Sequence, residues 1–227
     1  MNPRQIVLDT ETTGLDPALG HRVIEIGAVE ILNRRITGAS FHVYLNPDRD
    51  SDPGALQVHG LTREFLADKP RFAAVAEAFL AFVRDAEVLI HNAPFDVGFL
   101  DSELARVGAP RLRAHCEVRD TLKLAKELHP GQKNNLDALC RRYAVDNSGR
   151  ALHGALLDAQ LLAEVYLAMT RGQESLGIDV VPSMRQDPLG AARRGPLRVL
   201  RAGADELARH GDYLAGMARE CGEVMSW

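Results

Sequence analysis

The chain has 227 residues, of which 46% are hydrophobic and 26% are charged, and these values are those of one globular domain with room for a tail. Its formal net charge of −4 excludes a broad basic surface that would wrap a nucleic-acid duplex, so any hold on nucleic acid must be local. No apolar stretch approaches the roughly 20 residues that cross a bilayer, and the residues before Ile6 lack the apolar segment of a secretory signal. Three widely spaced cysteines without a C-x-x-C pair disfavour structural disulfides and a zinc site, so we expect a protein of the reducing cytoplasm.

In chain order, the predicted elements begin with a β-meander. Residues 6–8 form an apolar run typical of a short buried strand, and residues 22–32 and 36–45 alternate well enough for two half-buried strands. The later predicted elements are a helix over 72–83, a strand over 87–90, and helices over about 94–107, 120–128, 135–144 and 155–171. This order implies a mixed sheet covered by helices, which is the α/β class.

The composition changes after about residue 172. Residues 181–196 contain prolines, glycines and charges, which are typical of a flexible linker. Residues 197–227 regain some apolar periodicity but are too few to bury a core, so we expect a docking tail there, with a disordered end as the alternative. The expected organisation is a domain over 1–180, followed by the linker and the tail.

Two carboxylates lie two residues apart after the first predicted strand. Residues i and i+2 of a strand point to the same face, so the side chains of Asp9 and Glu11 would project side by side from the strand end. Gly14 and the threonines before it would then turn the chain away. Neighbouring anions repel unless a cation lies between them, and hard divalent cations with oxygen ligands fit that need. The pattern D-x-E is common, however, and a polar strand end that faces water is the alternative.

Two later segments add two carboxylates and a histidine. Asp96 falls in the first turn of one predicted helix, and Asp158 falls in the first turn of another, with His153 just before it. Taken alone, such an Asp merely favours its helix dipole and such a His is a capping residue. Together, the acids come from ends and first turns of elements beside the sheet, where α/β folds gather their sites. Two divalent metals about 3.5–4 Å apart would neutralise four such acids and form a clamp for attack at phosphorus.

The three acidic segments occur in a characteristic order. The sequence D-x-E, then N-x-x-F-D, then H-x-x-x-x-D resembles the histidine-bearing branch of the DEDD exonuclease superfamily. Six longer runs resemble, more narrowly, the epsilon subunits of bacterial DNA polymerase III; they are residues 4–14, 23–30, 41–45, 58–60, 136–143 and 152–160. The resemblance extends almost continuously from residue 4 to about 176. It implies a ribonuclease H-like mixed β-sheet flanked by helices, with a flexible C-terminal tail.

The same resemblance implies a 3′→5′ exodeoxyribonuclease that proofreads DNA synthesis and releases nucleoside 5′-monophosphates with two Mg²⁺ or Mn²⁺ ions. By this resemblance, Asp9, Glu11 and Asp158 bind the metals directly and also contact the substrate. Asp96 completes the second metal site, and His153 is expected to take the proton from the attacking water. A histidine with a pKa near its usual value of roughly 6.5 is a suitable base close to neutral pH.

The resemblance also implies contacts to the 3′ end of a single-stranded or frayed DNA primer. His59 matches a position that contacts the terminal nucleotide, although a helix-end histidine is the competing interpretation. Backbone groups around Thr12 and Gly14 are expected to approach the terminal sugar, and Leu15 is expected to wedge against the terminal base. A frayed end gives a physical route to proofreading, because a mismatched end melts at lower cost than a paired one.

Two C-terminal segments suggest protein partners within a bacterial replisome. Gln173, Leu176 and Ile178 lie in a segment that resembles the short peptides that bind the sliding clamp, though an ordinary turn explains these residues nearly as well. The tail, with Trp227 at its end, resembles the region that holds the catalytic alpha subunit of DNA polymerase III. Two other functions remain as alternatives: a stand-alone exonuclease on RNA or short oligonucleotide ends, and a non-catalytic scaffold between polymerase and clamp.

Overall fold

The computed structural model describes residues 4–150, 152–171 and 202–221. The chain divides into two compact units, Met1–Gly177 and Ile178–Trp227, and each is described by itself. The predicted linker, the clamp-like residues Gln173, Leu176 and Ile178, and the terminal Trp227 lie outside the described residues.

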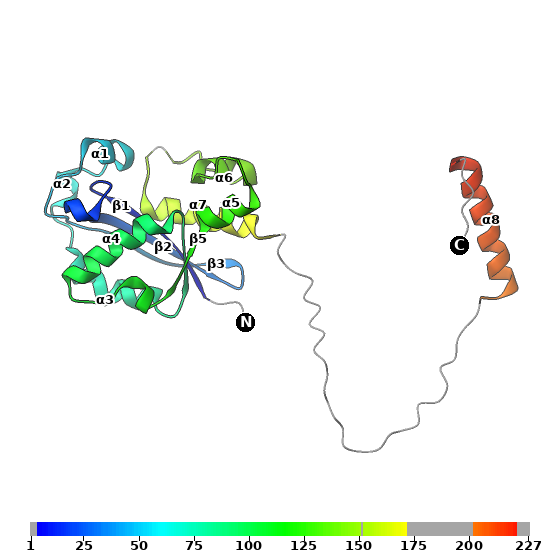
Figure 1. Cartoon of the computed structure of the whole chain (residues 1–227), viewed down its shortest axis with the longest axis horizontal. Helices are drawn as coiled ribbons and strands as arrows, with labels where there is room; N and C mark the ends of the chain where they lie inside the picture. Colours follow the sequence, from blue (N-terminus) through cyan, green and yellow to red (C-terminus); the bar gives the residue numbers. More distant parts are fainter. Residues whose placement is uncertain (1–3, 151, 172–201, 222–227) are drawn as a thin grey trace, which may run out of the picture. The chain divides into compact units, whose positions relative to one another are not determined.

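The first unit is built on a five-stranded mixed sheet with the strand order β3-β2-β1-β4-β5 (Figure 1). The strands are β1 (Gln5–Thr12), β2 (Val23–Leu32), β3 (Arg35–Tyr44), β4 (Glu87–Ile90) and β5 (Glu117–Asp120). Strand β2 pairs antiparallel with both β1 and β3, whereas β4 pairs parallel with both β1 and β5. The predicted mixed α/β fold is confirmed.

Helices cover both faces of this sheet (Figure 1). Helices α3 (Phe72–Val83) and α4 (Ala93–Arg106) cover one face, and α5 (Thr121–Leu128), α6 (Leu136–Tyr143) and α7 (Ala155–Met169) cover the other. The unit also contains α1 (Pro53–His59), α2 (Arg63–Leu66) and short 3-10 turns at Pro17–Leu19 and Leu112–Ala114. In β1, the side chains of Ile6 and Leu8 join the core under α3 and α4, while Val7 joins the core under α5, α6 and α7. All three are fully buried, and each such side chain contributes about 1.5–3 kcal/mol of hydrophobic free energy.

One expectation about the strands was wrong, and one strand was not predicted. Strand β1 continues to Thr12 instead of ending at residue 8, because β2 keeps pairing with it through Asp9↔Gly27 and Glu11↔Glu25. The acidic pair therefore lies inside the strand, still on one face. Strand β5 has no counterpart among the predicted elements, because Glu117–Asp120 holds one apolar residue among charged ones and exists through its pairing with β4.

In the second unit the structure describes one helix, α8 (Ala204–Cys221). Its first turn holds Asp205 and Glu206, which suit the positive end of the helix dipole, and Glu206 accepts a hydrogen bond from the Gly203 amide at 2.8 Å. The side chains of Leu207 and Tyr213 are exposed. Across the described residues, the search for a helix long and apolar enough to cross a membrane finds none.

Candidate active site

Strand β1 supplies two of the predicted carboxylates, and a glycine on β2 brings the third close to them. Gly27 pairs with Asp9, and a Cβ on Gly27 would lie 2.2 Å from the backbone of Ala155 and Leu156. Only glycine therefore lets the N-terminus of α7 rest on the sheet at this point. Because Asp158 lies in the first turn of α7, this contact sets its carboxylate beside the β1 pair.

The fourth carboxylate, Asp96, arrives from the other helical layer. Asn92 adopts a left-handed conformation (φ +67°) after β4, which turns the chain into α4. Asp96 then lies in the first turn of α4, and the hydroxyl of Thr10 donates a hydrogen bond to its Oδ1 at 2.7 Å. Thr10 lies on β1 between the two acids of the D-x-E pair, so one strand contacts the carboxylates of both layers.

The structure brings all five predicted catalytic and metal-binding residues into one cleft of about 430 Å³. These residues are Asp9, Glu11, Asp96, His153 and Asp158. Single ligand atoms of Glu11, His153 and Asp158 all lie within 4.8 Å of one another, a spacing at which such groups could hold a metal ion. Glu11, Asp96 and Asp158 are buried and Asp9 is half-buried, whereas the side chain of His153 is 45% exposed on the loop before α7.

Burial raises the pKa of three of these acids, Asp9, Glu11 and Asp96. Burial, followed by repulsion from Asp158 and Glu25, raises the pKa of Glu11 to about 8. Burial raises the pKa of Asp96 to about 7, although the Thr10 hydrogen bond opposes the rise. Burial and repulsion from Asp96 raise the pKa of Asp9 well above its ordinary range. Carboxylates this unfavourable in their charged form call for cations, and their oxygen atoms suit a hard divalent metal ion.

The cleft also contains residues that the sequence analysis did not select. They are Thr10, His91, Asn92, Phe95, Asn135, Leu136, Asp137 and Arg150. Arg150 is the most consequential, because its guanidinium pairs with Asp158 and Asp137. The sequence did contain a signal for this role: Arg150 lies three residues before His153, and a cation close to predicted acidic ligands can act as their counter-charge.

Among the residues expected to contact the substrate, Asp9, Glu11 and Asp158 line this cleft, whereas Thr12, Gly14, Leu15 and His59 lie outside its lining. His59 ends α1 and is only 4% exposed; its Nδ1 accepts a hydrogen bond from the Leu61 amide at 2.9 Å. Its Nε2 is buried with no hydrogen-bond partner among the described residues, and burial lowers its pKa. Leu15 is 84% exposed, and the Thr12 hydroxyl donates to the Gly14 carbonyl.

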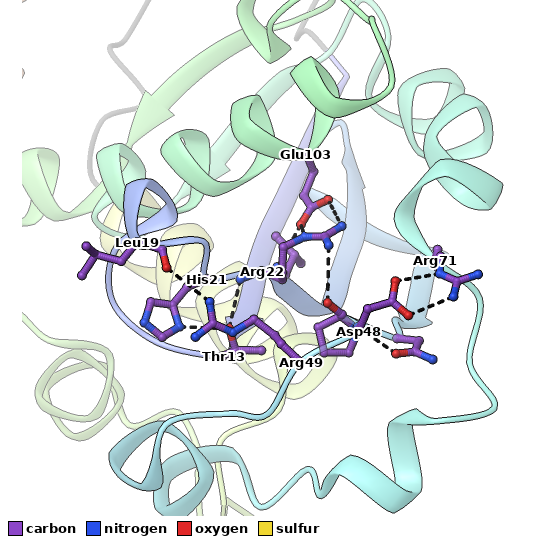
Figure 2. Close-up of polar contacts among 11 residues, drawn as sticks. Thr13, Leu19, His21, Arg22, Asp48, Arg49, Arg71 and Glu103 are labelled. Atoms are coloured by element: carbon purple, nitrogen blue, oxygen red, sulfur yellow. Dashed lines mark hydrogen bonds and ion pairs between the residues drawn. The ribbon is translucent and has the colours of Figure 1, made fainter.

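A polar network fixes the turn after β1 (Figure 2). The Thr13 hydroxyl lies 3.1 Å from His21 Nδ1 and accepts a hydrogen bond from the Arg22 amide at 3.0 Å. Arg22 in turn makes a two-bond contact with the buried carboxylate of Glu103. The Asp52 amide donates to the Thr13 carbonyl, so the segment that leads into α1 is held against the same turn.

The loop that carries His153 packs against the end of α1. The backbone amide of His153 donates to the Val58 carbonyl of α1 at 3.1 Å. Beside it, a Cβ on Gly60 would lie 2.6 Å from the Leu152 side chain, so the loop before α7 packs on the end of α1. The exposed His153 and the buried His59 are therefore carried by two segments in direct contact.

Comparison with known proteins gives consistent matches. Residues 6–166 match the sequence family described as Exonuclease. The chain is 52% identical over 219 residues to the DNA polymerase III subunit epsilon of Escherichia coli (strain K12), covering 91% of this chain and 90% of that one. It is 51% identical over 234 residues to the subunit of the same name from Salmonella typhimurium, covering 98% and 96%. These similarities span nearly the full length of the chains.

Solved structures with a similar fold include two exonucleases. One is Exonuclease X in complex with 5′ overhanging duplex DNA, with a TM-score of 0.60 and 26% identity over 74% of this chain and 92% of that one. The other is E. coli Exonuclease I in complex with a dT13 oligonucleotide, with a TM-score of 0.66. The latter is 20% identical and covers 75% of this chain and 41% of that one, so it bears on the fold alone.

Proposed function

Because the chain belongs to the family of DNA polymerase III epsilon subunits, and is thus a nuclease of that polymerase, we propose that it removes single nucleotides from the 3′ end of a DNA primer and so proofreads synthesis. The observation that carries this proposal is the convergence of four carboxylates and one histidine in a single cleft. A scaffold protein has no need of such a costly cluster of acids. The matches to exonucleases support the same assignment.

The acids are the groups that would hold metal. Asp9, Glu11 and Asp158 offer oxygen ligands on the α7 side of the cleft, and Asp96 offers them from α4. Two Mg²⁺ or Mn²⁺ ions in this position would lower the pKa of a water and neutralise charge on the phosphate. The raised pKa values of Glu11 and Asp96 support this assignment, because burial makes their charged forms unfavourable and bound cations would compensate for that cost.

His153 is the proposed general base. It is exposed, lies on the loop before α7, and its ring nitrogen Nδ1 is 3.3 Å from Asp158 Oδ2. In this position it would remove a proton from the water that attacks the terminal phosphodiester. The products are a nucleoside 5′-monophosphate and a strand with a new 3′ hydroxyl.

The substrate end is expected to lie against the turn after β1 and the end of α1. His59 presents a buried Nε2 without a partner among the described residues, which suits a hydrogen bond to the terminal nucleotide. Leu15 is almost fully exposed, as a wedge against a base must be. The Thr12 hydroxyl bonds to the Gly14 carbonyl, and this ordered turn supports the proposed contact of their backbone groups with the sugar.

The direct test uses a 5′-labelled DNA primer on a template, with either a paired or a mismatched 3′ end. We expect shortening by one nucleotide at a time that requires Mg²⁺ or Mn²⁺, stops with EDTA, and is faster on the mismatched end. An Asp158→Asn variant is the inactive control. Internal cuts, or no shortening with either metal, would contradict the proposal, and equal degradation of an RNA primer would favour the stand-alone exonuclease.

We also propose that the C-terminal unit binds the catalytic alpha subunit, within the replisome of a bacterial cytoplasm. Helix α8 has exposed apolar side chains at Leu207 and Tyr213, which suit a protein interface. Size-exclusion chromatography with purified alpha subunit should show a complex for the full chain and none for a chain that ends at residue 180. Clamp binding through Gln173, Leu176 and Ile178 is tested in the same way with alanine at all three positions.

A further inference from the structure

The guanidinium of Arg150 is inserted among the carboxylates of the cleft. Its Nε and Nη2 donate to Oδ1 and Oδ2 of Asp158, both at 2.5 Å, and its Nη1 donates to Asp137 Oδ1 at 2.6 Å. The side chains of Arg150 and Asp158 are 7% and 5% exposed. This is a two-pronged, charge-assisted contact in which both oxygens of one proposed metal ligand are engaged.

The same guanidinium also engages the proposed general base. Nη2 of Arg150 lies 2.8 Å from Nδ1 of His153. Arginine has only donors and keeps its charge, so this hydrogen bond requires the lone pair of Nδ1. The ring proton then belongs to Nε2, and in that tautomer neither nitrogen is free to accept a proton from water.

We propose that Arg150 is a built-in counter-cation that competes with divalent metal for Asp158 and releases both Asp158 and His153 when metal binds. The inference rests on the proposed function and extends it to a residue outside the acidic motif. A cation bound by Asp158 needs at least one of the two oxygens that Arg150 holds. Because a cation on these oxygens repels the positively charged guanidinium that holds them, metal binding displaces this fork and frees Nδ1 of His153 at the same time.

The surroundings of Arg150 provide a place for the displaced guanidinium. Asp137 is 46% exposed and therefore lies nearer to solvent than Asp158, and it already accepts a hydrogen bond from Nη1. The Asn147 side-chain amide donates to the same Asp137 oxygen at 3.2 Å, and the Asn147 backbone carbonyl accepts a hydrogen bond from the Arg150 amide. The loop before α7 therefore contacts Asp137 independently of the guanidinium. Arg150 can thus leave Asp158 and stay paired at the wall of the cleft.

The test is the affinity of the full chain for Mn²⁺, measured by calorimetry at fixed pH after removal of metal with EDTA. Arg150→Met should bind the first Mn²⁺ about tenfold more tightly than the wild type, equivalent to about 1.4 kcal/mol. Arg150→Lys keeps the charge but cannot grip both oxygens, so it should fall between the two. Arg142→Met is the matched control: it removes the same charge from an arginine that contacts Asn134 and Lys133 instead of the acids, and its Mn²⁺ affinity should stay unchanged.

Thermal unfolding gives a second readout that does not depend on activity. In EDTA, Arg150→Met should unfold at a lower temperature than the wild type, because the acids lose their counter-cation. With saturating Mn²⁺ this difference should largely disappear, whereas an arginine that only stabilises its loop would leave it unchanged. Equal or weaker Mn²⁺ binding by both Arg150 variants overturns the inference; a wild-type chain that binds no Mn²⁺ would overturn the proposed function instead.

Discussion

Gly27 of β2 and Ala155 of α7 are in backbone contact: a Cβ on Gly27 would lie 2.2 Å from the Ala155 carbonyl carbon. This contact sets the distance between the sheet and the helix that carries Asp158. A side chain at residue 27 must therefore push the first turn of α7 away from the carboxylates of β1.

We expect Gly27→Ala to destabilise the fold by about 1–3 kcal/mol, because a packed backbone cannot make room for an added methyl group. Nuclease activity should fall by about 100-fold or more, since a displacement of about 1 Å at a catalytic group has that effect. Chemical unfolding and primer shortening measure the two quantities. Gly98→Ala is the control: a Cβ there meets nothing within 4 Å, so helix α4 should gain roughly 0.5–1 kcal/mol and activity should persist. Wild-type activity in Gly27→Ala would contradict this account.

Thr10→Val should lower nuclease activity through its effect on Asp96 alone. The Thr10 hydroxyl lowers the pKa of Asp96 by donating a hydrogen bond to the charged form. Its removal raises that pKa above about 7, so protons compete better with metal at neutral pH. The acidic limb of the activity profile should move to higher pH, with activity recovering in alkaline buffer. A uniform loss of activity at every pH would instead indicate a general disturbance of β1.

The same-face relationship of Asp9 and Glu11 could be predicted from sequence because it needs only the two-residue period of a strand. The convergence of Asp96 and Asp158 on that pair was inferred from their places in the first turns of helices beside the sheet and from the resemblance, and not from periodicity. The predicted end of β1 was too early, because the apolar run stops at Leu8 and polar residues follow it. Pairing with β2 nevertheless continues through Thr12. That pairing is a contact between segments far apart in sequence, which local patterns do not reveal.

The sequence analysis did not predict β5 or the role of Arg150. Strand β5 is held by its parallel pairing with β4, about 30 residues earlier, and its own alternation of charges hides it. Arg150 lies in an irregular loop without periodicity, and its pairing with Asp158 depends on how α7 rests on Gly27. Tertiary contacts determine both features, so sequence spacing alone could not predict them.

Without metal, the stability of the protein should fall as pH rises. The pKa of Glu11 is raised from its ordinary value of 4.5 to about 8, and that of Asp96 from 3.8 to about 7. Between the ordinary and the raised values the folded state binds more protons than the unfolded state, so the free energy of unfolding decreases with pH. Urea unfolding in EDTA from pH 5 to pH 8 should show this slope, and Mn²⁺ should flatten it. Glu11→Gln should reduce the slope, and stability that rises over this range would rule the explanation out.

His153→Ala should separate catalysis from metal binding. The histidine is proposed to move a proton and lies outside the set of oxygen ligands, so Mn²⁺ affinity should change little while turnover falls by about 100- to 10,000-fold. Asp9→Ala should remove metal affinity and activity together. Calorimetry and primer shortening, made on the same protein preparations, compare the two variants. Full turnover by His153→Ala would exclude it as the base.

The ion pair between Arg22 and Glu103 anchors the turn after β1 (Figure 2). The Glu103 side chain is 2% exposed, so Arg22→Leu leaves a buried charge without its partner and should cost about 3–5 kcal/mol of stability. The double variant Arg22→Leu/Glu103→Leu should recover most of this loss, because the unpaired charge is removed. Urea unfolding of the single and double variants measures both effects. If the double variant is as unstable as Arg22→Leu, packing of the arginine stem, and not the buried charge, accounts for the loss.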